Sequence, residues 1–212
     1  MNDCTILYYT SNDESESFEK RTKDNILKVT DLPIISVSQK PIDFGDNICV
    51  GKQGASGFNM FRQVLIGLKK VKTRFVISAE ADCLYPPDYF TWRPETNDCW
   101  RNSNLYVIGI MTATRDRGAY YHKPNGATHA QIVGTQYYID VLEKLFKDAP
   151  EWCIEEKNFP KERTGNDDVF DRYKLYETLN PVVQRKTRDS MRWYTSSSKK
   201  PLYTIPYWGT DV

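Results

Sequence analysis

Two carboxylates separated by one residue end an apolar segment in the first half of the chain. The segment 74–79 reads RFVISA, and Glu80-Ala81-Asp82 follows it directly. Side chains alternate along a strand, so we expect Glu80 and Asp82 to point the same way. Carboxylate oxygens in that arrangement suit a hard divalent cation. The competing interpretation is a turn that carries two solvated acids.

A second acidic pair, Asp167 and Asp168, lies in the second half of the chain. A carboxylate can act as a general base when burial and neighbouring acids raise its pKa toward neutrality. Two acids at the start of a helix are also an ordinary N-terminal cap. The residue types alone leave both catalysis and helix capping open for this pair.

The elements around the first pair alternate between strand and helix. Apolar runs of strand length cover 4–9, 34–38 and 74–79, and helical patterns cover 16–29 and 58–68, with a glycine-rich loop at 41–57. This alternation predicts parallel strands joined by right-handed crossovers, an α/β fold. Ligands of such sheets bind at the carboxyl ends of the strands. Thr10 and Ser11 follow the first strand, so they should lie near Glu80 and Asp82.

The second half of the chain has a less regular pattern. We expect a strand at 105–112, a polar loop at 113–130, a short strand at 131–133, a helix within 132–145, an irregular stretch at 149–166 and a helix at 167–179. The last thirty residues are polar, basic and aromatic, which indicates a lid or tail. Neither an internal repeat nor a linker divides the sequence, so we expect one domain over 1–212.

Composition and charge narrow the possible function classes. Hydrophobic residues make up 40% of the 212 residues and charged residues 27%, which is typical of a globular protein. A net charge of +1 provides no global field toward nucleic acid or membranes. The five cysteines are scattered without a CxxC pair, which fits a reducing cytoplasm. We see no signal peptide and no apolar run of about 18–20 residues, so we expect no membrane span.

Residues 59–90 resemble the core of GT-A-type glycosyltransferases, especially small family-2-like enzymes. Those enzymes have an Arg-Asn near the start of a helix, and then a strand that ends in Asp-x-Asp or Glu-Asp-Asp. Arg62-Gln63 takes the first place in this sequence and Glu80-Ala81-Asp82 the second. The segment 85–90, YPPDYF, is similar to the continuation often found there. The resemblance extends over about residues 4–90 and is loose beyond.

This resemblance implies a nucleotide-sugar donor, most often a UDP-sugar, and a Mn²⁺ or Mg²⁺ ion. Asp82 would ligate the metal that bridges the two phosphates, and Glu80 would support the metal or contact the ribose. Thr10 and Ser11 would begin the nucleotide pocket, and Arg62 would face the base or the diphosphate. A divalent ion serves such chemistry because negative charge develops on the leaving diphosphate.

The segment 165–168 is similar to the Gly-Glu-Asp motif of inverting family-2-like enzymes, in which the second acid deprotonates the acceptor hydroxyl. The resemblance implies that Asp168 is this base and that Asp167 is its neighbour. The sequence departs from the family in two ways. Glu80 replaces the first Asp of its motif, and no His lies near the C-terminus to complete the metal shell. His122 and His129 lie in the middle loop instead.

On this interpretation residues 1–100 are the nucleotide-sugar-binding half, 101–180 the acceptor-binding half and 181–212 a basic-aromatic tail or lid. The acceptor could be a glycan, a protein, a small molecule or a hydroxymethylated base in duplex DNA. The DNA option rests on the small size of the chain, which is typical of virus-encoded modifiers such as those of phages. It also rests on a basic cluster that contains Arg185, Lys186, Arg188 and Arg192.

Two other functions are compatible with the same fold. Sugar-phosphate nucleotidyltransferases have a glycine-rich phosphate loop after the first strand, whereas residues 10–13 read TSND and contain no glycine. A non-catalytic domain would bind a nucleotide or sugar without turnover. The sequence favours transfer of a sugar to a hydroxyl group, with inversion if Asp168 is the base.

Overall fold

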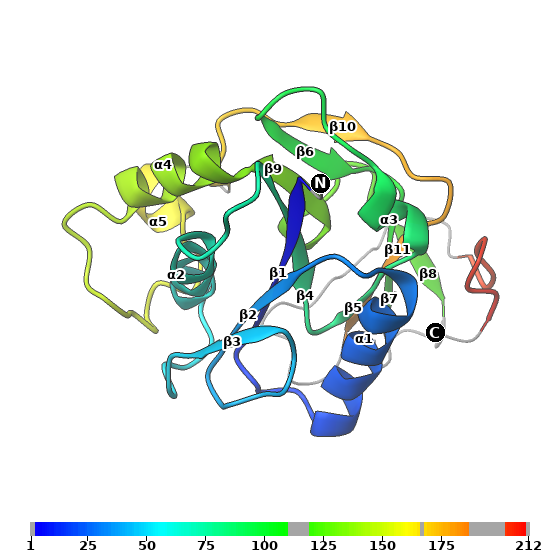
Figure 1. The fold of residues 1–212 in the computed structure, drawn as a ribbon, viewed down its shortest axis with the longest axis horizontal. Coiled ribbons are helices and arrows are strands. Elements are labelled where there is room, and N and C mark those ends of the chain that lie inside the picture. Colours follow the sequence, from blue (N-terminus) through cyan, green and yellow to red (C-terminus); the bar gives the residue numbers. More distant parts are fainter. Residues whose placement is uncertain (1–2, 110–118, 166–167, 187–201, 211–212) are drawn as a thin grey trace.

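The computed structural model describes residues 3–109, 119–165, 168–186 and 202–210 (Figure 1). The helices are α1 (Glu16–Val29), α2 (Gly57–Leu68), α3 (Pro87–Thr91), α4 (Thr135–Leu145) and α5 (Lys161–Thr164), with a 3-10 turn η1 (Thr128–Ala130). The strands are β1 (Cys4–Thr10), β2 (Ile34–Ser38), β3 (Asp46–Cys49), β4 (Phe75–Glu80), β5 (Cys83–Leu84), β6 (Cys99–Asn102), β7 (Leu105–Gly109), β8 (Tyr120–His122), β9 (Gln131–Gly134), β10 (Lys174–Tyr176) and β11 (Val182–Lys186).

A seven-stranded sheet with the order β10-β6-β9-β4-β1-β2-β3 forms the centre of the molecule. The strands β4, β1, β2 and β3 run parallel, and β10 runs parallel to β6. Only β9 is antiparallel to its neighbours within this sheet as described. The predicted α/β class, with a mostly parallel central sheet flanked by helices, is therefore confirmed.

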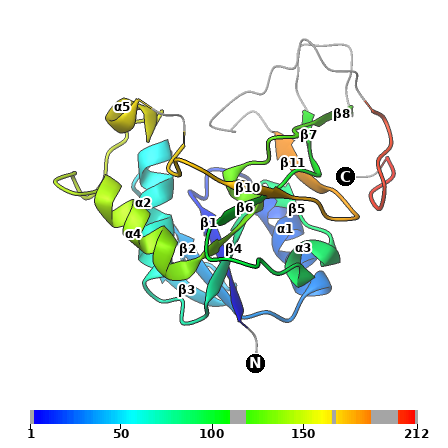
Figure 2. The same ribbon diagram turned by 90° about the horizontal axis from the view of Figure 1, so that it is seen from above.

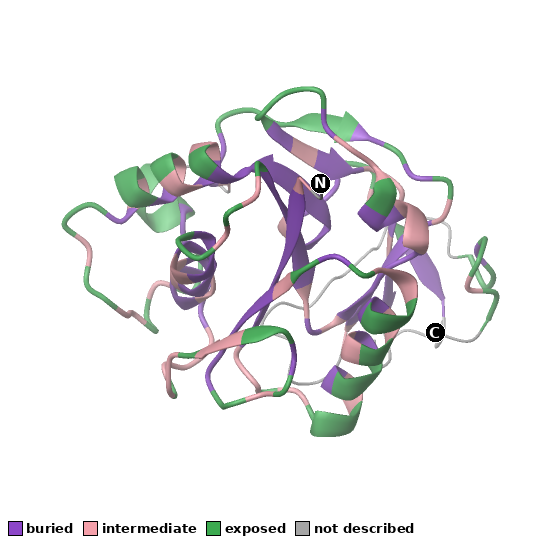
Figure 3. Ribbon diagram, in the orientation of Figure 1, coloured by how far each residue is buried: buried purple, intermediate pink, exposed green. Residues whose placement is uncertain are grey.

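Helices cover both faces of this sheet (Figure 1). Ile6 and Tyr8 of β1 belong to one buried cluster together with residues of α1 and α3. Leu7 and Tyr9 belong to another, together with residues of α2 and α4. Because side chains alternate along a strand, β1 contributes to both cores. In Figure 3 the buried strands lie between helices whose outer surfaces are exposed.

A second, four-stranded sheet has the order β5-β11-β7-β8 and lies to one side of the central sheet (Figure 2). β11 pairs in parallel with β7 and antiparallel with β5. β5 begins at Cys83, only three residues after β4 ends at Glu80. The turn that carries Glu80 and Asp82 therefore joins the two sheets.

The structure differs from the sequence expectation mainly in the second half. The helix predicted at 167–179 is wrong, because the described residues 168–173 form bends and irregular backbone and β10 then pairs with β6. The tail or lid predicted at 181–212 is also wrong at its beginning, because residues 182–186 form the inner strand β11. Val182 and Val183 are fully buried there, as suits β-branched residues in an inner strand. β3 was missed inside the predicted loop at 41–57.

The helices are short. α1 has 14 residues and begins after Ser15, whose side chain accepts a hydrogen bond from the Phe18 N–H. Within the described ranges, no helix combines the length and the apolar character that crossing a membrane requires.

Gly134 ends β9 at a close contact with the segment that precedes β6. A Cβ atom added there would lie 2.5 Å from the carbonyl oxygen of Asn97 and 2.9 Å from its Cα. We predict that Gly134→Ala destabilises the protein by about 1–3 kcal/mol, because the backbone of the neighbouring segment must move. The free energy of unfolding in urea measures this effect. Gln136→Ala, at an exposed site of α4, is the control and should change it by less than about 0.5 kcal/mol.

An equal stability of wild type and Gly134→Ala would contradict the close packing between β9 and the segment before β6.

Candidate functional site

A pocket of about 380 Å³ lies at the carboxyl ends of β1, β2 and β4. This is the position at which open α/β sheets bind ligands, and the volume is in the range of small-molecule sites. The wall includes Tyr9, Thr10, Ser11, Asp13, Glu14, Gln39, Gly54, Gln63, Glu80, Asp82, Lys123, His129, Asp168, Gln184 and Lys186. The two acidic regions singled out in the sequence thus contribute to one pocket.

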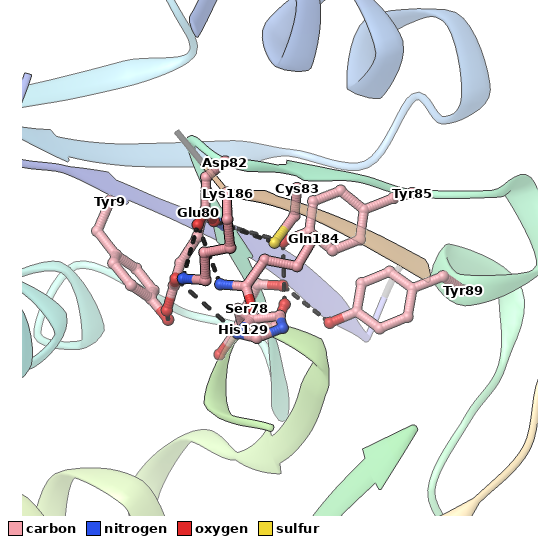
Figure 4. Close-up of polar contacts among 10 residues, drawn as sticks. All are labelled: Tyr9, Ser78, Glu80, Asp82, Cys83, Tyr85, Tyr89, His129, Gln184 and Lys186. Atoms are coloured by element: carbon pink, nitrogen blue, oxygen red, sulfur yellow. Dashed lines mark hydrogen bonds and ion pairs between the residues drawn. The ribbon is translucent and has the colours of Figure 1, made fainter. Parts of the chain in front are cut away.

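Glu80 is the last residue of β4 and has partners from two other elements (Figure 4). Its Oε1 accepts a 2.9 Å hydrogen bond from the Tyr9 hydroxyl, and its Oε2 lies 4.0 Å from Nδ1 of His129. Burial raises the pKa of Glu80, and the nearby Asp82 raises it further, whereas Lys186 and the Tyr9 hydrogen bond lower it. The hydrogen bond from Tyr9 of β1 therefore holds the carboxylate on the wall, and His129 of η1 lies beside it.

A buried tyrosine fixes the backbone at the end of β4. The Tyr85 hydroxyl accepts a 2.9 Å hydrogen bond from the Glu80 N–H and donates one of 2.9 Å to the His129 carbonyl. Its ring is fully buried and stacks on Tyr89, with 4.9 Å between the ring centroids. The segment from Tyr85 to Phe90 therefore supports the acidic turn from behind the pocket wall.

Asp82 is held by β11 (Figure 4). Its Oδ2 accepts a 3.0 Å hydrogen bond from Nε2 of Gln184 and lies 3.4 Å from Nζ of Lys186. Its carbonyl oxygen accepts a 2.7 Å hydrogen bond from the Arg185 N–H. Gln184 was missed in the sequence. The signal was the alternation in VVQRK at 182–186, which places Gln184 and Lys186 on one face of a strand.

Two further wall residues come from the segment between β8 and β9. His129 is buried, and its Nε2 has no hydrogen-bond partner among the described residues. Burial lowers the pKa of His129, and Lys123 and Lys186 lower it further, so the ring is neutral at pH 7. Lys123 is half-buried. Burial lowers the pKa of Lys123, and the positive charge of Lys186 lowers it further. The other histidine, His122, is not on the wall and lies 2.9 Å from the Ser103 carbonyl.

Thr10 and Ser11 both lie on the wall, at the end of β1. The Thr10 hydroxyl donates a 2.7 Å hydrogen bond to the buried Glu19 carboxylate and accepts one of 2.9 Å from the Asn12 N–H. Burial raises the pKa of Glu19. The Thr10 side chain therefore joins the end of β1 to the start of α1, and this contact fixes the backbone at this edge of the pocket.

Arg62 is not among the residues that line the pocket. Its guanidinium lies 3.8 Å from the ring centroid of Phe146 and donates a 2.7 Å hydrogen bond to the Pro150 carbonyl. The next residue, Gln63, lies on the wall and donates to the backbone carbonyls at the ends of β1 and β2, at 2.9 and 3.1 Å. Arg62, which was expected to face the base or the diphosphate, is therefore not brought to the pocket with the other candidate residues, because consecutive helix residues point about 100° apart.

Asp168 lies on the wall in a bidentate ion pair with Arg101 of β6. The Arg101 side chain is only 5% exposed, and its guanidinium lies 4.2 Å from the ring centroid of Tyr173. Asp168 Oδ1 also accepts a 3.1 Å hydrogen bond from the Phe170 N–H. Since no helix follows, Asp168 is not a helix cap. Asp167 lies outside the described residues.

The predicted basic cluster is divided by the alternation of β11. Lys186 points to the pocket, whereas Arg185 points to α1, where it is 2% exposed and donates a 2.8 Å hydrogen bond to the Thr22 hydroxyl. Arg185 is therefore unavailable for a DNA phosphate, which corrects that part of the prediction. Arg188 and Arg192 lie outside the described residues.

Glu80 and Asp82 offer hard oxygen donors to a divalent cation. Both carboxylates already have protein partners, and the described part of the chain has no group of three His, Cys, Asp or Glu side chains placed to hold a metal. The remaining ligands would have to come from phosphate oxygens and water.

Solved structures similar to this chain include the following three. The S. aureus TarS 1–349 fragment in complex with UDP-GlcNAc shows 12% identity and a TM-score of 0.49, over 92% of this chain and 62% of that one. The apo-form glycosyltransferase GlyE of Streptococcus pneumoniae TIGR4 shows 12% identity and a TM-score of 0.43, over 82% and 44%. The bifunctional IspDF of Campylobacter jejuni shows 9% identity and a TM-score of 0.45, over 84% of this chain and 50% of that one.

No protein-family model matches the chain, and no curated protein sequence matches it. The chain spans less than two thirds of each of these three structures. All three TM-scores lie below 0.5, so we base the function on the residues of the pocket.

We predict that Asp168→Ala destabilises the protein by about 2–3 kcal/mol. The change leaves a buried guanidinium without its counter-ion, which costs about 3–5 kcal/mol in a fully buried pair. The Asp168 side chain is 26% exposed, so water offsets part of this loss. Urea denaturation measures the difference. Asp171→Ala, at an exposed acid three residues later, is the matched control and should have little effect.

Equal stabilities for Asp168→Ala and Asp171→Ala would show that the ion pair with Arg101 does not support the fold.

Proposed function

We propose that the protein transfers a sugar from a nucleoside-diphosphate sugar to a hydroxyl acceptor, with the GT-A arrangement of its strands. The observation that carries this proposal is the Glu80–Asp82 pair at the carboxyl end of β4, on a pocket wall shared with the ends of β1 and β2. Nucleotides bind at this position in open α/β sheets.

The wall has a neutral amide part and a charged part, which suits the two parts of a nucleotide. Gln39 donates a 3.0 Å hydrogen bond to the Gly54 carbonyl and accepts hydrogen bonds from the N–H groups of Gln53 and Gly54 at 2.7 and 2.9 Å. Together with a 3.5 Å contact from its Nε2 to Oε1 of Gln63, these bonds use all the donors and acceptors of the Gln39 amide, so this part of the wall offers a nucleobase a fixed neutral surface. The charged part around Glu80 and Asp82 suits the diphosphate and its counter-ions. This division supports a nucleotide-sugar donor over a neutral sugar alone.

A Mn²⁺ or Mg²⁺ ion belongs to the proposal, and Glu80 and Asp82 would hold it. When bound, such an ion stabilises the charge that develops on the leaving diphosphate. On the protein side, Tyr9 orients the Glu80 carboxylate and Gln184 orients that of Asp82. These hydrogen bonds limit the side-chain freedom that ligand binding would otherwise have to restrict.

Asp168 is our candidate for the base that takes the proton of the acceptor hydroxyl, with Asp167 as its neighbour in the chain. Arg101 and the Phe170 N–H fix the orientation of its carboxylate. Oδ2 accepts one hydrogen bond, from Arg101, and so retains capacity for a second one from a hydroxyl. A base that activates the acceptor for direct displacement leads to inversion at the sugar carbon. Since Arg185 is buried, the described residues favour a DNA acceptor no more than a glycan or a small molecule.

We predict that UDP or a UDP-sugar raises the melting temperature of the protein by about 5–10 °C at a hundredfold excess over its Kd. Such an excess stabilises the folded state by about 2.7 kcal/mol, and 1 kcal/mol shifts Tm by about 2–4 °C in a chain of this size. Mn²⁺ should increase the shift in the wild type and not in Asp82→Asn. Asp43→Asn, at an exposed acid outside the pocket, should behave as the wild type.

Absence of any shift with every nucleoside diphosphate tested would sink the proposed donor site. Slow hydrolysis of the bound UDP-sugar, measured as release of UDP, distinguishes a transferase from a non-catalytic binding domain. Binding without release, with or without candidate acceptors, would favour the binding domain.

A further inference from the structure

Lys123 occupies a fixed position on the pocket wall, although its side chain belongs to a connecting segment. Its backbone N–H donates a 2.7 Å hydrogen bond to the Leu105 carbonyl, and its carbonyl accepts one of 3.2 Å from the Gly126 N–H. Gly126 has φ +63°, and a Cβ atom there would lie 2.7 Å from Cβ of Arg101. The turn after Lys123 is therefore packed tightly against β6, so its position is well defined.

The ammonium group of Lys123 has no hydrogen bond or ion pair to any residue that the structure describes. A half-buried lysine without a direct ion pair is unfavourable, because the charge loses hydration and the Glu80 and Asp82 carboxylates offset only part of this loss. Burial and the charge of Lys186 accordingly lower the pKa of Lys123. An anionic ligand in the pocket would supply a direct ion pair.

Lys186 faces the same pocket from β11, and its ammonium group uses only some of its N–H donors. It makes one contact with the described residues, 3.4 Å to Oδ2 of Asp82, and Gln184 binds the same oxygen at 3.0 Å. An ammonium group has three N–H donors. Its remaining donors are available to a ligand while Gln184 continues to hold Asp82.

The charges on the described wall favour one position for an anion. The acidic groups there are Asp13, Glu14, Glu80, Asp82 and Asp168. Lys123 and Lys186 are the only lysines or arginines among the described lining residues, and the neutral His129 adds no charge. An anion that enters the pocket is therefore repelled from most of the wall and attracted to these two ammonium groups.

We propose that Lys123 and Lys186 form an anion site that binds the diphosphate of the ligand directly, without requiring a metal. The inference deepens the proposed function and rests on it for the identity of the nucleotide. The chemistry that the two lysines recognise is a diphosphate, so inorganic pyrophosphate is the simplest probe. Neither lysine takes part in bond making, and both act by binding and orienting the phosphate groups.

Isothermal titration calorimetry in the presence of EDTA tests this site. The wild type should bind pyrophosphate and UDP, and Lys123→Gln should weaken both by about tenfold, which is about 1.4 kcal/mol. Binding of uridine, which lacks phosphate, should not change. Lys123→Arg should retain most of the affinity, because the charge remains. Lys147→Gln, at an exposed lysine in the turn after α4, is the control and should bind as the wild type.

Lys186→Gln should also weaken pyrophosphate binding by about tenfold, with its thermal stability measured alongside because the change removes the cation beside Asp82. Lys123→Gln is the decisive variant, since it breaks no ion pair with a described residue. Pyrophosphate binding by the wild type that requires Mg²⁺, or equal binding by the wild type and Lys123→Gln, would overturn the anion site.

The two proposals fail in different ways. If the wild type binds UDP no more tightly than pyrophosphate and does not bind uridine, the result supports the anion site and contradicts the nucleotide site. If the wild type binds uridine and UDP equally and does not bind pyrophosphate, the result supports a nucleoside site and contradicts the anion site.

Discussion

Two carboxylates at the buried end of β4 set the main constraint on this structure. Carboxylates removed from water are unfavourable unless they are paired or hydrogen-bonded. The partners here come from different elements: Tyr9 of β1 donates to Glu80, and Gln184 and Lys186 of β11 contact Asp82. Tyr85 adds a backbone contact between the acidic turn and η1. Satisfying Glu80 and Asp82 therefore requires the central sheet, the second sheet and the segment between them to be in place together.

Most elements of the first ninety residues could be predicted closely because they are local, whereas the short strands β3 and β5 were missed. Apolar runs of strand length and a 3.6-residue helical period gave β1, α1, β2, α2 and β4 almost at their observed bounds. The second half could not be predicted in the same way, because pairing between distant segments decides it. Residues 168–176 have helical spacing, yet β10 pairs with β6 and Asp168 binds Arg101. Those partners lie about seventy positions away, where no local pattern reports them.

Within the candidate site, the sequence identified regions better than individual residues. The strand end at Thr10 and the turn at Glu80 and Asp82 do line the pocket, and Asp168 joins them. Two adjacent pairs show what was missed. Gln63 faces the pocket and Arg62 does not, and Lys186 faces it while Arg185 is buried. One residue of register reverses the role of a side chain, and the choice depends on packing that composition does not reveal.

The pairing of β5 with β11 has a consequence for the order in which the site matures. The contacts from Asp82 to Gln184 and Lys186 span 102 and 104 positions of sequence. Closing loops of that size is entropically unfavourable, so such contacts form after the local strands and helices. During synthesis the acidic turn is made long before its cation. A functional pocket therefore requires that the chain has folded through residue 186. A chain whose synthesis stops earlier contains the two carboxylates without the lysine that balances their charge.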